Sequence, residues 1–581
     1  MAEKIISPGV FVNESDKSLV SRGPVVTGAA IVGPTVNGRP LVPTVVTSYS
    51  DYVSQFGETF KSGSQYYEYF TSLAAKEYFS GGGQSLLVTR IISGSAYNTY
   101  AQAAVSSFSD SATPSFTLEA LAYGNQLNNT SSLSAGGALA SGSSSNIRWE
   151  VTNVNTGSGT FTITVRQGDD NTQNKNILET WANLSLDPQL PNYISRVIGD
   201  EKPVYVAAAG GDDAYVQLTG SYAVSSQYVR VASINTIQVD SIDNDGNYKA
   251  TQYSGSLPAV GSGSYGGSFS GGVAATNRAS AAFFDNITPS ATNSQGFIMT
   301  EYEAGIALLS NKDEYDFNLL LSPGLFLSAN ANATSDNIIG IAEGRGDAFA
   351  IADLVAFGAG KNGAIQAAAG STSNYGAGYW PWVQTFSANL GRPVWVPASV
   401  VMAGVYSFND QVGAEWFAPA GLNRGGIGSV IRAEKKLSAD DRDSLYEANV
   451  NPLATFPGEG VVAFGQKTFQ KRPTSLDRIN VRRLLINLKR FVTSVSRQLV
   501  FEQNTTVTRN RFLSTVNPYM ESVVSRQGLY AYKVIMDDTN NTADVIDRNQ
   551  LVGQIYVQPT KTAEFIILDF TLQPTGATFP V

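Results

Sequence analysis

The chain of 581 residues contains no cysteine and no histidine. It therefore has no thiol nucleophile, no disulfide, no Ser-His-Asp triad and no metal site built on Cys or His ligands. Any catalysis would have to rest on carboxylates, Lys, Tyr or Ser-Lys arrangements. We accordingly expect a protein that is not an enzyme and that uses no cofactor and no metal.

Charge and long apolar runs are also scarce. Charged residues make up 15% of the chain, and the formal net charge is −9. No apolar run approaches the ~18 residues that are needed to cross a bilayer. The opening residues, MAEKIISPGVFVNE, lack the apolar core of a signal peptide, so we expect synthesis and retention in a cytoplasm. The 55 glycines, 27 tyrosines and 28 phenylalanines favour turns and strands over long helices.

Near its start the chain alternates between strand and helix patterns. AAIVGPT and SLLVTRII are short apolar runs typical of buried strands, and SYSDYVSQFGE predicts a short helix capped by Ser50 or Asp51. QYYEYFTSLAAKEYFSGGG predicts a longer amphipathic helix that ends at the glycines 81–83. The same α/β pattern resumes after residue 298 with EYEAGIALLSNKDEYDFNLLLSPG.

Between these two segments the composition changes. Residues 91–147 contain only two charged side chains, and IRWEVTNV and GTFTITVRQG then alternate as strands do. We predict a multidomain α+β or α/β fold with a β-rich protruding insertion and extended terminal arms. The predicted units are an N-terminal arm (1–22), the first part of an α/β middle domain (23–93), the β-rich insertion (94–298), the second part of the middle domain (299–375), a C-terminal core (376–562) and a C-terminal arm (563–581).

Both ends of the chain are predicted to be strands without a neighbour close in sequence. Pro8 excludes a helix in ISPGVFVNES, where Val10 and Val12 face opposite to Phe11. AEFIILDFTLQ, near the C-terminus, alternates in the same way. Its apolar face consists of Ile566, Leu568, Phe570 and Leu572. Segments of this kind can add a strand to the sheet of another chain.

Several short motifs resemble metal-binding, phosphate-binding or catalytic sites, but their spacing or context does not match such sites. In SIDNDGNYKATQ, the first and last ligand positions of a calcium loop hold Ser241 and Gln252, so a hairpin turn is favoured. GAGKNG has no Ser or Thr after Lys361, and chance readily supplies the Arg-Gly-Asp at 345–347. Adjacent carboxylates diverge and are more typical of turns and caps than of an acid/base pair. These are Asp169 with Asp170, Asp212 with Asp213, and Asp440 with Asp441, the last of which forms a predicted capping box with Ser438.

One basic segment remains unexplained in this acidic chain. Between Lys467 and Arg511 there are eleven Lys and Arg but only two acids, a balance of +9. RINVRRLLINLKRFVTSVSRQLVF predicts an amphipathic helix with an apolar arc formed by Val481, Leu484, Leu485, Leu488, Phe491, Val492, Val495 and Leu499. The opposite, basic face consists of Arg482, Arg483, Lys489, Arg490 and Arg497. A solvated face is the ordinary explanation, but unshielded like charges repel, which favours an acidic protein partner. The basic face itself contains no aromatic residue, whereas aromatic residues accompany the basic ones in nucleic-acid binders.

Several segments, in their order along the chain, resemble the tail sheath proteins of contractile-tailed bacteriophages of the large myovirus type. The resemblance begins with SPGVFVNESD, AIVGPTVNGRP, YSDYVSQFGE and AKEYFSGGGQSLLVTRI, and continues with RQGDD and NILETWANLSLDPQLPNYISRVIGD. It ends with NVNPLATFPGEGVVAFGQKT, INVRRLLINLKRFV, VFEQN and AEFIILDF, which are similar to the sheath core. Within 94–147 only AYGNQL is similar to the family.

The resemblance implies a structural subunit that forms stacked hexameric rings around a tail tube and contracts to drive the tube through the host envelope. Its partners would be further copies of itself, the tube protein, and baseplate and tail terminator proteins, without direct contact to nucleic acid or membrane. It would belong to the virion tail and assemble in the bacterial cytoplasm. The arms at 5–16 and 563–573 would add strands to sheets of neighbouring subunits.

In this family, basic residues of the C-terminal domain face an acidic tube. The resemblance assigns that surface, or its immediate support, to Arg482, Arg483, Lys489, Arg490 and Arg497, with Arg509 and Arg511 as second choice. Replacing Arg483 and Arg490 with Glu is then expected to abolish assembly on tubes and to leave the fold intact.

Three alternatives stay open. The Ser/Gly-rich insertion favours a receptor- or polysaccharide-binding tail spike or adhesin, which the α/β pattern explains poorly. A carboxylate glycosidase would need two separated acids, and no such pair stands out. The sheath of a phage-derived injection particle would have the same sequence features as a phage sheath.

Overall fold

A computed structural model describes residues 28–564 apart from short segments. The segments outside the description are 63–64, 93–98, 109–112, 123–126, 130–131, 145, 211–212, 236–243, 246–256, 264–265, 273–294, 298 and 328–337. The predicted N-terminal arm and the predicted C-terminal arm from residue 565 onward lie outside the described residues, and with them Val10, Phe11, Val12, Ile566, Leu568, Phe570 and Leu572.

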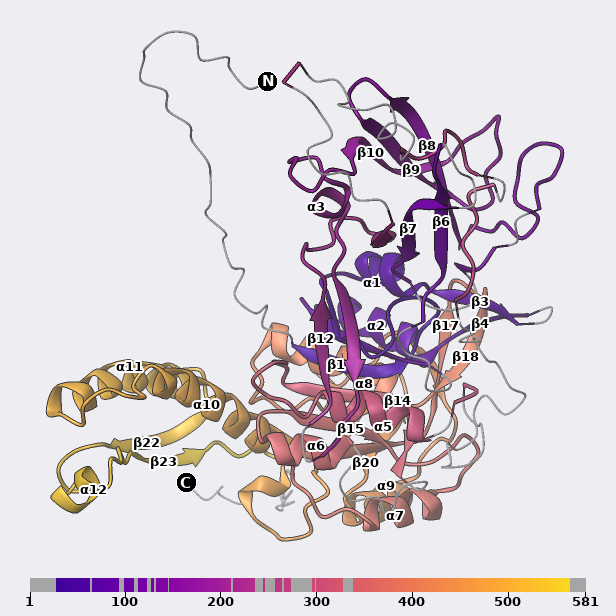
Figure 1. Cartoon of the computed structure of the whole chain (residues 1–581). Helices are drawn as coiled ribbons and strands as arrows, with labels where there is room; N and C mark the ends of the chain where they lie inside the picture. The colour runs from indigo at the N-terminus through magenta and orange to yellow at the C-terminus, as the bar shows by residue number, and fades with distance from the viewer. Residues whose placement is uncertain are drawn as a thin grey trace, which may run out of the picture.

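An eight-stranded sheet organises the molecule (Figure 1). Its order is β2 (Thr44–Val46), β5 (Leu86–Ile91), β1 (Ala29–Pro34), β14 (Leu319–Phe326), β15 (Phe349–Asp353), β16 (Gly376–Trp380), β20 (Asn451–Phe456) and β21 (Gly460–Ala463). The six inner strands pair in parallel, and the two outer strands are antiparallel to their neighbours. Parallel strands are covered on both faces, which explains why β1, β14 and β15 are buried along their whole length and are predominantly apolar.

Helices cover this sheet and share its hydrophobic core. They are α1 (Tyr49–Phe56), α2 (Phe70–Ser80), α5 (Met299–Leu308), α6 (Ile338–Arg345), α7 (Lys361–Ala369), α8 (Ala398–Val412) and α9 (Ala439–Glu447). Two glycines let α2 and α8 approach closely, because a Cβ on Gly81 would lie 2.3 Å from the carbonyl oxygen of Gly404. The predicted capping box of α9 is confirmed: the Ser438 hydroxyl accepts from the backbone N–H of Asp441, whose carboxylate accepts from the N–H of Ser438.

Two details of the predicted helices are wrong. The N-cap of α1 is Ser48, whose hydroxyl accepts from the backbone N–H of Asp51 at 3.1 Å. The helix α2 begins only at Phe70, because the aromatic residues before it form β4 (Gln65–Glu68), which pairs with β3 (Thr59–Ser62). Tyr and Phe suit strands, and tertiary pairing here overrides the helical pattern.

Between β5 and α5 the chain forms a second body with its own core, built from smaller antiparallel sheets. Its strands are β6 (Gln102–Ser106), β7 (Pro114–Ala120), β8 (Ile147–Asn155), β9 (Thr160–Gln167), β10 (Ile177–Ser185), β11 (Lys202–Val206), β12 (Tyr215–Thr219) and β13 (Val229–Ile234), with the short helix α3 (Ile194–Ile198). A further sheet next to the α/β domain contains β18 (Arg392–Val396), β17 (Val383–Ser387) and β19 (Val430–Ala433). The predicted mixed α/β architecture with many strands is confirmed.

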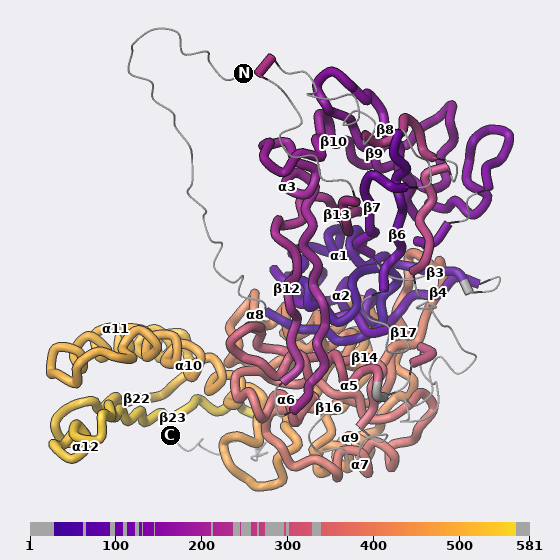
Figure 2. The backbone as a smooth tube through the Cα atoms, in the orientation of Figure 1, coloured from indigo at the N-terminus to yellow at the C-terminus, as the bar shows by residue number. Residues whose placement is uncertain are grey.

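The last part of the described chain leaves the α/β domain as a separate lobe, yellow in Figure 2. A 3-10 turn (Ser475–Asp477) leads into α10 (Ile479–Arg497), followed by α11 (Thr506–Ser525), β22 (Leu529–Ile535), α12 (Ala543–Asp547) and β23 (Gln554–Pro559). We refer to residues 479–559 as the C-terminal lobe.

Candidate assembly surfaces in the C-terminal lobe

The predicted amphipathic helix is α10, and its apolar arc forms the core of the C-terminal lobe. Leu484 of α10 and Phe512 of α11 are buried in this core, which also includes side chains of β22. Phe491 stacks on Tyr519 of α11 with 3.7 Å between the ring centroids. The apolar arc therefore joins two helices, as its spacing predicts.

The basic face of α10 lies against carboxylates of the α/β domain. Its three arginines spaced by seven residues form the ion pairs Arg483–Asp410, Arg490–Asp316 and Arg497–Asp313. The exposed fraction of the arginine side chain rises along the helix, from 1% through 21% to 63%. The row is thus buried where α10 begins and open to water where it ends.

The innermost pair is the most constrained. Arg483 donates to both carboxylate oxygens of Asp410, at 2.7 and 2.5 Å, and its guanidinium lies 5.0 Å from the ring centroid of Tyr406. Burial acts to lower the pKa of Arg483, but the charge and hydrogen bonds of Asp410, together with the charges of Glu415 and Tyr406, outweigh burial and raise this pKa. A bidentate ion pair of this kind fixes the direction of α10 as well as its position.

Two other predicted surface residues are buried. The guanidinium of Arg482 lies 3.6 Å from the ring centroid of Tyr375, and burial is the main cause that lowers its pKa. Arg509 of α11 is also buried and donates to Asp538 at 2.6 Å.

The expectation of an unshielded basic face is therefore wrong. Its arginines at the start of α10 are enclosed, and acidic partners come from the same chain. Replacing Arg483 with Glu would place two carboxylates together in a buried site, so we no longer expect the fold to tolerate that change. Of the predicted tube-facing set, the residues with exposed or half-exposed side chains are Lys489, Arg490, Arg497 and Arg511.

A two-stranded sheet forms the other candidate surface. Within the part of the chain that the structure describes, β22 pairs only with β23, so each strand keeps one open edge. Tyr530 and Tyr556 are exposed large side chains on these strands. An open edge with unpaired backbone N–H and C=O groups is a template for a strand from another chain.

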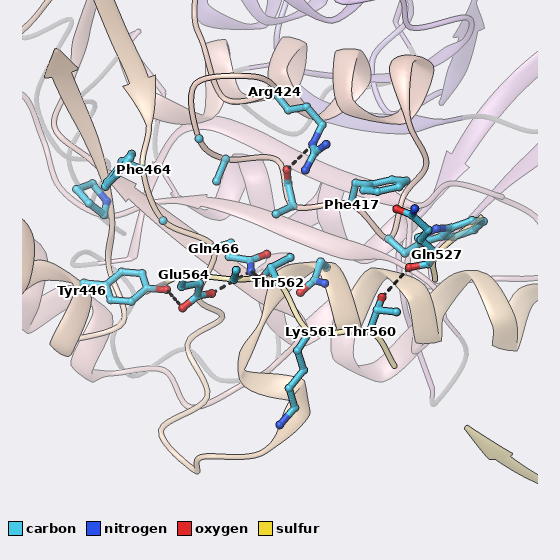
Figure 3. Close-up of a pocket in the computed structure, with 18 of the residues that line it drawn as sticks. Phe417, Arg424, Tyr446, Phe464, Gln466, Gln527, Thr560, Lys561, Thr562 and Glu564 are labelled. Carbon is cyan, nitrogen blue, oxygen red and sulfur yellow. Dashed lines mark hydrogen bonds between the residues drawn. The ribbon is translucent and has the colours of Figure 1, made fainter. Parts of the chain in front are cut away.

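The described chain ends beside this sheet, at the edge of a cavity of about 940 Å³ (Figure 3). Residues 560–564 form one wall, and Trp416, Phe417 and Phe464 contribute apolar surface. The carboxylate of Glu564 accepts hydrogen bonds from side chains of three other segments. Here the predicted C-terminal arm begins.

The motifs that the sequence analysis set aside have structural roles where they are described. Arg345 of the Arg-Gly-Asp triplet is buried, pairs with Asp347 at 2.9 Å and donates to two backbone carbonyls. Lys361 bonds Asp441, which lowers the pKa of that carboxyl to about 2. Asp170 accepts from two buried arginines, Arg148 and Arg166. Most of the stretch from Ser241 lies outside the described residues.

Among the residues that the structure covers, no group of three or more Asp or Glu side chains is arranged to hold a metal ion. No described helix is both long enough and apolar enough to cross a membrane.

Sequence reasoning did not find the acidic partners of α10. Asp410, Asp316 and Asp313 lie 73, 174 and 184 residues away from their arginines in the chain. The seven-residue spacing of the arginines is the one local feature that points to such partners, because it places the three side chains in a row along one side of the helix, where they face the same neighbour.

The fold has a counterpart among solved structures. The sheath tail protein of Listeria innocua aligns with 92% of this chain and 96% of its own, with a TM-score of 0.51 and 10% sequence identity. At this identity the likeness shows a shared fold.

Family comparisons define the class more closely. Residues 287–469 match the phage tail sheath protein central domain, and residues 471–573 match the phage tail sheath C-terminal domain. Over these two consecutive ranges the chain is similar to phage tail sheath proteins.

Two curated relatives are tail sheath proteins. The chain is 40% identical over 188 residues to that of Vibrio phage KVP40 and 40% identical over 185 residues to that of Enterobacteria phage T4. Each alignment covers 32% of this chain and 28% of the relative, so the chain matches less than a third of the length of these relatives.

Proposed function

We propose that this protein is a structural subunit of a contractile tail sheath. It assembles as stacked hexameric rings around a tail tube, and the rings contract to drive the tube through the host envelope. The observation that carries the proposal is the consecutive match of residues 287–469 and 471–573 to the central and C-terminal sheath domains. The role is structural, and the protein is a component of the virion tail that is assembled in the host cytoplasm.

The subunits are joined by their terminal arms. Residues 5–16 and 563–573 of neighbouring copies add strands to the open edges of β22 and β23, where main-chain hydrogen bonds supply affinity and alternate side chains fix the register. Contacts of this head-to-tail kind that do not close on themselves generate a helical stack of rings. Residues 94–298 form the insertion that protrudes from the sheath core.

The tube lies against the C-terminal lobe. Its contact surface comprises the four basic residues with exposed or half-exposed side chains, Lys489, Arg490, Arg497 and Arg511. The buried Arg482, Arg483 and Arg509 support this surface from within. Charge contacts between this surface and the smooth tube hold the sheath in its extended state. During contraction these contacts break one ring at a time. Baseplate and tail terminator proteins bind the two ends of the stack, and neither nucleic acid nor membrane is a direct partner.

Contraction uses free energy stored during assembly. The extended sheath is metastable, held by a kinetic barrier and by its contacts with tube and baseplate. On release, the subunits move as rigid bodies and the arms act as hinges, so the mesh stays connected.

Sedimentation of the purified protein tests the role of the arms. The full-length chain is expected to form pelletable polymers above a threshold concentration, and deletion of residues 1–20 is expected to abolish them. A matched control keeps the length and replaces residues 1–20 by a Gly/Ser segment, which should behave as the deletion does. Polymers of unchanged threshold in either variant would contradict the assigned role of this arm.

A further inference from the structure

Glu564, the last residue that the structure describes, is held by side chains from three separate segments. Figure 3 shows two of the donors, Tyr446 and Gln466. Arg478 donates to both carboxylate oxygens of Glu564, from Nε at 2.7 Å and from Nη2 at 2.9 Å. The hydroxyl of Tyr446 donates to the same carboxylate at 2.8 Å, and the side-chain amide of Gln466 donates at 3.0 Å. Four hydrogen bonds thus converge on one side chain.

These bonds are partly shielded from water. The side chain of Arg478 is 25% exposed and that of Glu564 is 17% exposed. Burial, followed by the charge of Glu564, raises the pKa of Tyr446, so its hydroxyl keeps the proton that it donates. Paired guanidinium–carboxylate bonds are about twice as strong as neutral ones and impose a direction.

The three donors stand on well-anchored backbone. Tyr446 lies on α9 of the α/β domain, and Arg478 is the N-cap residue of α10. Gln466 is tied to the same point, because its carbonyl accepts from the backbone N–H of Ile479 at 2.9 Å. The carboxylate of Glu564 therefore joins the end of the described chain to the junction between the α/β domain and the C-terminal lobe.

Apolar packing does not hold the segment that leads to Glu564. Lys561, Thr562 and Ala563 are exposed, and on one side of them lies the cavity of about 940 Å³. The other fixed points are polar too: the hydroxyl of Thr560 donates to the carbonyl of Gln527 at 2.7 Å, and Thr562 accepts from Gln466. With open space beside it, the segment takes its direction from these hydrogen bonds.

We propose that Arg478, Tyr446 and Glu564 form a positioning clamp, which fixes the point and the direction in which the C-terminal arm leaves each subunit. The inference rests on the proposed function, in which residues 563–573 pair with the sheet of a second copy. A fixed starting point reduces the conformational freedom that the arm loses on pairing, and so strengthens the joint between subunits. Because Arg478 is the N-cap residue of α10, the clamp also makes the arm follow any movement of that helix.

Distance measurements on the unassembled protein test the clamp directly. The chain has no cysteine, so Ser525→Cys at the end of α11 and Gln573→Cys in the arm accept two spin labels without competition. Double electron–electron resonance is expected to give a narrower distance distribution for the otherwise unchanged chain than for Glu564→Gln or Tyr446→Phe. The matched control is Asp544→Asn, which removes the exposed Arg548–Asp544 pair of the same lobe and should leave the distribution unchanged.

Polymerisation supplies the second readout. Glu564→Gln is expected to raise the threshold concentration ~10-fold, the ratio that corresponds to ~1.4 kcal/mol, while Asp544→Asn leaves it unchanged. Equal distance distributions in Glu564→Gln and the unchanged chain would overturn the clamp, whatever the polymers do. If the unchanged chain never polymerises, with purified tail tubes present as well as absent, the proposed function fails, and the distance distributions still decide whether the clamp exists.

Discussion

The row of ion pairs along α10 predicts a graded loss of stability when its carboxylates are removed one at a time. The three variants are Asp410→Asn, Asp316→Asn and Asp313→Asn. Each removes one negative charge that pairs with an arginine of α10, and the three arginines are spaced by seven residues. The difference between the variants therefore reports how strongly each pair is shielded from water.

The magnitude follows from burial. Asp410→Asn leaves the guanidinium of Arg483, 1% exposed, without its counter-charge, and an uncompensated buried charge costs ~3–5 kcal/mol. The lower end applies here because the Asp410 side chain is itself 24% exposed. In the outermost pair both side chains are more than half exposed, and such pairs contribute ~0–1 kcal/mol. Asp316→Asn falls between these limits.

Hydrogen exchange of the α10 backbone amides, followed by mass spectrometry, measures the opening of the lobe locally. Asp410→Asn should speed this exchange ~100-fold, since each ~1.4 kcal/mol is a factor of ten, and Asp313→Asn should change it little. Equal effects of the three variants, or the largest effect at Asp313, would refute the assignment of stability to the buried end of the row.

Three further outcomes are expected. The buried carboxyl of Asp353 has its pKa raised, by burial, from 3.8 to about 6, so the folded state holds this proton at a pH where the unfolded chain has lost it. Its stabilising contribution is therefore complete below about pH 4 and is lost as the pH rises through about 6. In chemical denaturation, the free energy of unfolding of the unchanged chain, relative to that of Asp353→Asn, should fall over that pH window. A difference that stays constant with pH would contradict the account. The double variant Lys489→Glu, Arg511→Glu should co-sediment more weakly with tail tubes. Its thermal unfolding midpoint should not change, because both side chains are exposed. Unchanged co-sedimentation would show that these two residues are not part of the tube-facing surface. Ser438→Ala should cost ~1 kcal/mol of stability through loss of the cap of α9, measured by urea denaturation, and no loss would show that the box contributes nothing.

Local patterns predicted a good part of this architecture. The apolar arc of α10 and the capping box at Ser438 follow from spacing along a few turns, and both are present. The apolar residues of β1 and β5 predicted buried strands, and both strands are buried along their whole length, as expected for parallel strands that are covered on both faces.

Features that depend on contacts between distant parts of the chain could not be predicted from the sequence. The helix pattern before Phe70 gave way to β4, because pairing with β3 decides the conformation of an aromatic segment that suits either state. The charge on α10 was predicted correctly, but its neutralisation by Asp410, far away in the chain, depends on how α8 and α10 meet. The clamp on Glu564 likewise joins side chains 86 to 118 residues apart in the chain.

Negative-stain electron microscopy of the purified full-length protein, at rising protein and salt concentration, tests the central claim most directly. The account predicts rings that stack into striated hollow tubes, because the proposed arms would pair with the open sheet edges of neighbouring subunits. Dispersed single particles at every concentration, with purified tail tubes present as well as absent, would contradict it.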